Sequence, residues 1–81
     1  MPAPQRPDLI EEERRLRRLQ AIVREVSLLI LDPDFPAVDI AIARQDAREE
    51  ALRLFPDKAD LWEMIYESRF DRLIAQFRPE A

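Results

Sequence analysis

The side chains of this sequence that could take part in chemistry are mostly carboxylates and guanidinium groups, with few nucleophiles among them. The others are Lys58, Tyr66, Ser27 and Ser68. Both serines fall in strongly helical stretches without a neighbouring base, so we expect each hydroxyl to bond back to the carbonyl one turn earlier. We therefore predict no catalytic residue, and an enzyme ranks third among the functions considered.

Three residue types that usually build reactive sites are missing, namely cysteine, histidine and glycine. Without Cys and His the chain lacks the usual metal ligands, thiol nucleophiles and general bases. Without Gly it cannot form the phosphate-binding loops that need backbone free of a Cβ. The sequence therefore predicts neither a cofactor nor a metal site.

Length and composition indicate one small folded unit. The chain has 81 residues, 47% of them hydrophobic, and a net charge of -4. Its longest unbroken apolar run is Leu28 to Leu31, far short of the ~20 residues that span a bilayer. The N-terminal residues also lack the apolar stretch of a signal peptide. We expect an acidic, cytoplasmic protein without a membrane partner.

Proline divides the chain into an arm and three helices. Pro2, Pro4 and Pro7 predict a flexible, Pro-rich arm over residues 1–7. Because Pro cannot continue a helix, the later prolines separate the helices of a single domain over residues 8–78. The expected helices span about residues 9–31, 37–55 and 58–77.

Aspartates near these boundaries are the expected helix caps. Asp8 precedes the first helix, Asp34 the second and Asp57 the third, with Asp60 completing a carboxylate variant of the capping box. A start of the second helix at Asp39 is an alternative. No alternating apolar run persists, so the fold class is all-α, a three-helix bundle of antiparallel helices that stands alone or is completed by dimerisation.

The first helix carries an apolar stripe at heptad spacing, interrupted by Glu12. Its C-terminal half is apolar nearly all round and should be buried on several sides. The stripe and one arginine of the third helix form the candidate interface: Leu9, Leu16, Leu19, Val23, Val26, Ile30 and Arg69. Apolar residues off the stripes indicate a second surface or are ordinary exposed side chains. They are Ile10, Leu28, Leu31, Ile42 and Met64.

Four of the five residues from Arg14 to Arg18 are arginines, which could grip phosphate. At helical spacing, however, Glu11 can pair with Arg15 and Glu13 with Arg17. Nucleic-acid binding depends on uncompensated basic charge, whereas this charge is compensated locally and the whole chain is acidic. A solvated, salt-bridged face is the favoured interpretation.

Arg44 and Arg69 fall within otherwise apolar helix faces. The favoured interpretation is that each stem covers apolar surface while the head reaches water. Alternatives are a bidentate pair with a carboxylate such as Glu63 or Glu12, or an anchor for a protein partner.

These observations predict a small interaction or assembly module, or adaptor, that acts through helix packing with itself as a homodimer or with another protein. The alternative, of a different class, is a nucleic-acid-associated regulator that uses the Arg14 to Arg18 cluster.

Overall fold

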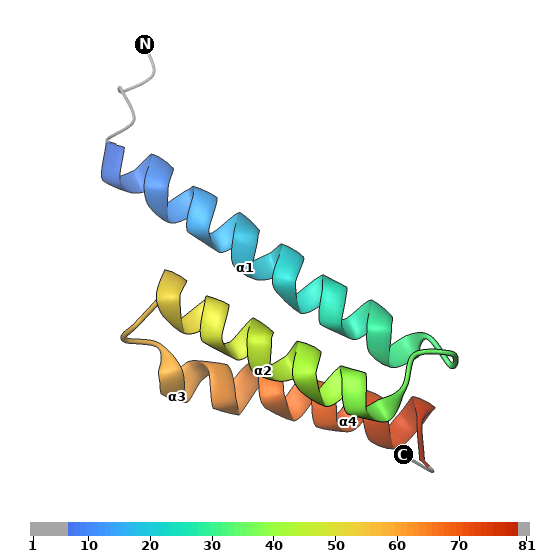
Figure 1. The fold of residues 1–81 in the computed structure, drawn as a ribbon. Helices are drawn as coiled ribbons and strands as arrows, with labels where there is room; N and C mark the ends of the chain where they lie inside the picture. The colour runs from blue at the N-terminus through green and yellow to red at the C-terminus, as the bar shows by residue number, and fades with distance from the viewer. Residues whose placement is uncertain (1–6, 80–81) are drawn as a thin grey trace.

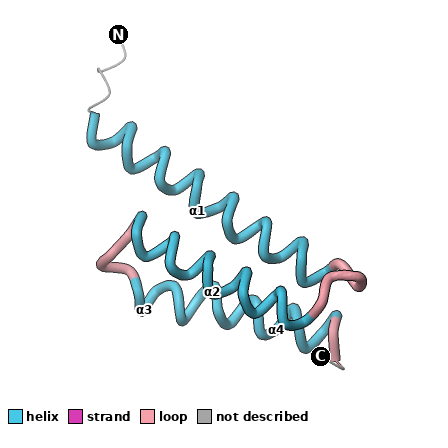
Figure 2. Tube along the Cα trace, in the orientation of Figure 1, coloured by secondary structure: helices cyan, strands magenta, loops and turns pink. Residues whose placement is uncertain are grey.

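The computed structural model describes residues 7–79 of the chain, so residues 1–6 of the expected arm lie outside the described part. The elements are α1 (Pro7–Leu31), α2 (Ala37–Leu54), α3 (Ala59–Leu61), η1 (Trp62–Glu67) and α4 (Ser68–Phe77). The last three follow without a break and form one helical stretch. Figures 1 and 2 show three helical stretches side by side, each running opposite to the one before it. Within residues 7–79 there is no strand, and the predicted all-α three-helix bundle is confirmed.

The helices begin close to the predicted residues, but the predicted caps are wrong. α1 begins at Pro7, so Asp8 lies inside the helix rather than before it. The N-cap of α2 is Pro36 rather than Asp34, and that of the third stretch is Lys58 rather than Asp57. Neither observed cap residue makes a side-chain hydrogen bond. Proline explains the first two starts, because its fixed φ suits the edge or first turn of a helix without a side-chain acceptor.

Neither Asp39 nor Asp60 acts as predicted. Asp39 lies inside the first turn of α2, which begins at Ala37. The start of α3 has no side-chain cap, so the capping box with Asp60 does not form. In the first loop the backbone N–H of Asp34 donates to Oδ1 of Asp32 over 3.0 Å. Aspartate therefore organises this turn locally instead of capping the helix that follows it.

The core lies between α1 and the other two helical stretches. Ile30 and Phe70 are fully buried, and Trp62 contacts Phe70 edge to face with ring centroids 6.0 Å apart. Ala47 and Ala51 of α2 are buried too, and such small side chains let α1 approach closely. The remaining buried side chains are Ile22, Val23, Val26 and Ile40.

A π-helical segment interrupts the third stretch, which the sequence predicts as regular helix. Between Trp62 and Glu67 the backbone bonds run one residue further than in an α-helix. Ser68 shows the change, because its hydroxyl donates to the carbonyl of Glu63, five residues back, over 3.4 Å. In regular helix Ser27 donates to Val23, four residues back, over 2.8 Å, as predicted.

The C-terminal half of α1 is not buried on several sides, contrary to expectation. Leu28 is 60% exposed and Leu31 is exposed as well. Of the described elements, α2 and the third helical stretch pack against α1, and no described residue covers the face opposite them. Ile10, Ile42 and Met64, the other residues off the stripes, are exposed too.

Arg78 closes the end of α1, which has no basic residue in its last turn. Its Nη1 donates to the carbonyl oxygens of Asp32, over 2.8 Å, and Ile30, over 3.4 Å. Its Nη2 donates to the carbonyl oxygen of Phe35. The last carbonyls of a helix lack intrahelical partners and carry partial negative charge, so a guanidinium stabilises them.

We expect Arg78→Met to lower the free energy of unfolding by about 1–3 kcal/mol, because it leaves several carbonyls without their charged donor. Urea unfolding followed by circular dichroism measures the change. Arg72→Met is the matched control, because Arg72 is exposed and makes no ion pair with a described residue. Equal losses in the two variants would contradict the role of Arg78.

Candidate functional site

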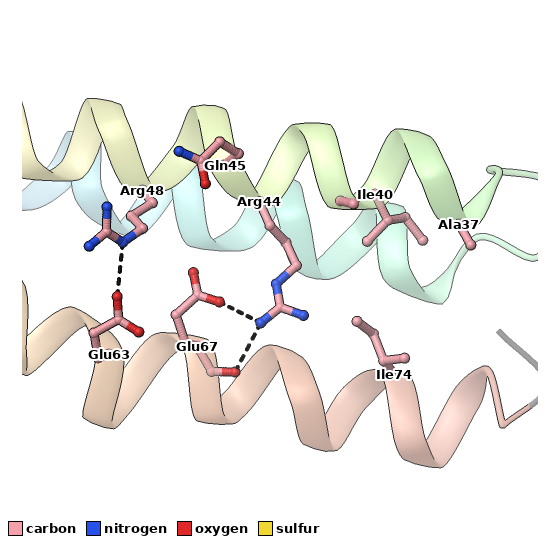
Figure 3. Close-up of a pocket in the computed structure, with 9 residues that line it drawn as sticks. Ala37, Ile40, Arg44, Gln45, Arg48, Glu63, Glu67 and Ile74 are labelled. Carbon is pink, nitrogen blue, oxygen red and sulfur yellow. Dashed lines mark hydrogen bonds and ion pairs between the residues drawn. The ribbon is translucent and has the colours of Figure 1, made fainter.

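A groove of about 470 Å³ lies between α2 and the third helical stretch. Figure 3 shows its charged residues reaching across from one helix to the other, beside an apolar end formed by Ile40 and Ile74. Its lining residues are Ala37, Ile40, Ala41, Arg44, Gln45, Arg48, Glu63, Glu67 and Ile74. This groove contains the densest set of interacting polar side chains in the described chain, so it is the first candidate for chemistry.

Arg44 is the centre of that set. Its Nη2 donates to the Glu67 carboxylate and to Oδ1 of Asp71, the latter over 3.0 Å. Glu67 also accepts a 2.9 Å hydrogen bond from Nε1 of Trp62. The guanidinium lies 5.6 Å from the ring centroid of Phe70. The side chains of Arg44 and Glu67 are only 20% and 19% exposed, so this pair is largely shielded from water.

The favoured interpretation of Arg44, with its head in water, does not hold, because the side chain is only 20% exposed. The alternative, a pair with a carboxylate, does form, but only Nη2 donates and the partner is Glu67 rather than Glu63 or Glu12. Glu63 pairs instead with Arg48, over 2.9 Å.

The π-helical segment favours Glu67 as the partner, because its five-residue repeat lets Glu67 accept from Trp62 and from Arg44 together. Burial works against the charged form of Arg44, but its hydrogen bonds to Glu67 and Asp71 outweigh burial and raise its pKa. The Arg44 guanidinium therefore stays charged.

This arrangement is suited to holding helices together rather than to catalysis. Each carboxylate that lines the groove, Glu63 and Glu67, is bound to an arginine and is not available as a base. Neither serine lines the groove. Within residues 7–79 no group of three or more acidic side chains could hold a metal ion.

The Arg14 to Arg18 cluster is compensated, although not through all the predicted pairs. The expected bridge between Glu13 and Arg17 is present at 3.5 Å. Glu11, however, pairs with Arg14 rather than with Arg15.

The other two arginines of the cluster contact the C-terminal end of α2. Arg15 extends toward that end, where its guanidinium lies 5.7 Å from the ring centroid of Phe55. Nε and Nη2 of Arg18 donate to the two carboxylate oxygens of Glu50 over 2.7 and 3.2 Å. Every arginine of the cluster is therefore engaged with a carboxylate or an aromatic ring.

The candidate interface on α1 divides into two parts. Val23, Val26 and Ile30 are buried in the core of the chain itself, and Leu19 is half-buried against it. As core residues they cannot serve a partner on the same side of the helix. Leu9 and Leu16, by contrast, are 54% and 46% exposed.

Arg69 belongs to a second groove, of about 490 Å³, which lies between α1 and the third stretch. This groove, which we call the basic groove, is lined by Gln20, Val23, Arg24, Ser27, Tyr66 and Arg69. The Arg69 guanidinium lies 5.7 Å from the ring centroid of Tyr66. No carboxylate of residues 7–79 lines the basic groove, so its two guanidinium groups have no acidic partner among its lining residues.

Arg24 is the residue of this site that the sequence interpretation missed. The signal for it was the absence of an acidic residue three or four positions away on the same helix, where Gln20, Ala21, Ser27 and Leu28 stand. Arg14, Arg15 and Arg17 of the neighbouring cluster have such residues, whereas Arg18 does not.

Comparison of the chain with protein-family models, with curated proteins and with solved structures gives no match. None of the helices in the described part of the chain combines the length and the apolar character needed to cross a bilayer. Function must therefore be argued from the surfaces above.

We expect Glu67→Gln to lower the free energy of unfolding by about 1–3 kcal/mol, because it removes the shielded carboxylate that balances Arg44. Thermal and urea unfolding, followed by Trp62 fluorescence, measure the loss. Asp71→Asn removes the exposed partner of the same arginine and should cost less than about 1 kcal/mol. A larger loss for Asp71→Asn would contradict this ranking.

The pair between Arg18 and Glu50 should make stability depend on pH. The hydrogen bond from Arg18 lowers the pKa of Glu50 below its ordinary value of 4.5. The contribution of Glu50 is therefore fully present above pH 4.5 and disappears as the pH falls through the lowered value. Unfolding free energies of wild type and Glu50→Gln should differ slightly at neutral pH and converge in acid. In an Arg18→Met background the difference should be smaller, because the hydrogen bond that is the main cause of the lowered pKa is gone.

Proposed function

We propose that this chain is a helical protein–protein interaction module that pairs with a second copy of itself through the exposed half of α1. The observation that carries the proposal is the exposure of Leu9 and Leu16. They continue at seven-residue spacing the line of Val23 and Ile30, which further along the same helix packs in the core. An apolar line that changes from buried to exposed along one helix is typical of a surface that binds a second helix.

The exposed half exists because α1 is longer than the helices that cover it. α1 has 25 residues and α2 has 18. At about 1.5 Å per residue the difference is roughly 10 Å. Figure 1 shows the N-terminal end of α1 extending past both the end of α2 and the beginning of α3. We call residues 9–16 the overhang.

The overhang is already a regular helix. Ion pairs from Glu11 to Arg14 and from Glu13 to Arg17 link successive turns, and Arg15 packs over Phe55 at its base. A partner would therefore meet a preformed helix, which lowers the entropy that binding must overcome.

A second copy of the chain is the partner we favour, because most protein assemblies are symmetric. Two-fold pairs are the commonest closed assemblies, and they use the same surface twice. A chain of this size also buries a smaller share of its surface than larger domains do, so an added interface contributes substantially to its stability. We place this pair in the cytoplasm, since a chain without cysteine gains nothing from an oxidising compartment.

Nucleic acid is not the partner we propose. Arg14, Arg17 and Arg18 pair with carboxylates, and Arg15 packs over an aromatic ring. Neutralising phosphates with these groups would require breaking those contacts, in a chain of net charge -4.

Sedimentation equilibrium at micromolar concentration should give wild type a mass of twice 9.6 kDa. Leu9→Glu/Leu16→Glu should give 9.6 kDa with unchanged helical circular dichroism, because both side chains are exposed in the single chain. Val38→Glu/Ile42→Glu is the matched control, with two exposed apolar residues changed on α2, and it should keep the wild-type mass. A wild-type mass near 9.6 kDa would contradict self-pairing.

A further inference from the structure

The basic groove and the overhang carry opposite charge. Arg24 and Arg69 line the groove without a carboxylate, although the chain as a whole is acidic. The overhang contains the glutamates Glu11, Glu12 and Glu13 and the arginines Arg14 and Arg15, so its net charge is -1. Glu12 is exposed and makes no ion pair with a described residue, and Glu13 contacts only its exposed neighbour Arg17. Each surface therefore offers the charge that the other needs.

The overhang and the α1 edge of the basic groove lie on one strip of α1. Leu9 and Leu16 are seven residues apart, Gln20 follows four residues later, and Ser27 another seven. These are spacings at which side chains share one side of a helix. The strip therefore runs from the overhang directly into the α1 edge of the basic groove.

The lengths of the two surfaces match. Leu9 to Leu16 and Gln20 to Ser27 each span seven residue steps, or about 10 Å of helix. In an antiparallel pair with its two-fold axis between Leu16 and Gln20, Leu9 would lie opposite Ser27 of the second copy. Glu12 and Glu13 would then lie opposite Arg24, and the symmetry repeats every contact.

From this complementarity we infer that the overhang of one copy docks in the basic groove of the other, with the two α1 helices antiparallel and Glu12 and Glu13 facing Arg24 and Arg69. The inference rests on the self-pairing proposed above and specifies its geometry. The ligand of the basic groove is thus a helix end that presents Glu12 and Glu13, supplied by a second copy of this chain.

Charge exchange tests the docking. Glu12→Arg/Glu13→Arg and Arg24→Glu/Arg69→Glu should each weaken self-association by roughly tenfold or more, because like charges then face each other. Mixed in equal amounts, the two variants should form a heterodimer of wild-type affinity, since both contacts again join opposite charges. Sedimentation equilibrium measures all three samples at low salt. Arg53→Glu/Lys58→Glu makes the same change in net charge as Arg24→Glu/Arg69→Glu, in the last turn of α2 and at the N-cap of α3, and should associate as wild type.

The absence of native cysteine allows a second test of the direction of the helices. An oxidised mixture of Leu9→Cys and Ser27→Cys should form a disulfide between the two variants. Leu9→Cys alone should form little, because an antiparallel pair separates the two copies of residue 9. Efficient crosslinking of Leu9→Cys with itself would indicate parallel helices and overturn the inference.

The outcomes separate this inference from the proposed function. If wild type is dimeric but the mixed charge variants do not restore association, the self-pairing stands and the docking is wrong. If wild type is monomeric throughout, the self-pairing itself is wrong and the docking falls with it.

Discussion

The packing of α1 against both other helical stretches is the constraint on which the rest of the structure depends. Val23, Val26 and Ile30 form the α1 side of the core, and buried alanines of α2 allow close contact there. α2 and the third stretch approach each other less closely than either approaches α1. Long side chains therefore bridge the space between them, with Arg44 and Arg48 from α2 reaching Glu67 and Glu63. The apolar packing thus sets the helix spacing, and the ion pairs form across the space that it leaves.

Ion pairs between nearby side chains determine which charged groups remain unpaired at the surface. The acidic residues of α1 stand near its N-terminal arginines, and those of η1 and α4 face α2. Among the described residues, no carboxylate lines the basic groove with Arg24 and Arg69. An acidic protein thus presents a local basic surface, which its net charge alone would not indicate.

The sequence predicts features that depend on neighbouring residues, such as helix ends. It misses features that depend on tertiary contacts, such as the partner of an ion pair. Proline places the helix ends within about two residues, and Ser27 bonds back to its own helix as expected. The π-helical segment and the choice of Glu67 by Arg44 depend on how Trp62 packs, which no local pattern encodes. The sequence predicts the heptad stripe of α1. The residue at which the stripe changes from buried to exposed depends on the length of α2, which the stripe itself does not encode.

The bond between Arg78 and the first loop has a consequence for how the protein is made. Its guanidinium binds carbonyl oxygens that lie 46 and 48 residues earlier in the chain. α1, the first loop and α2 are therefore synthesised before the residue that closes them, and Phe70 is added late as well. α1 and α2 alone would expose the apolar side that the third helical stretch covers. Folding of the bundle must thus wait for residues 70–78.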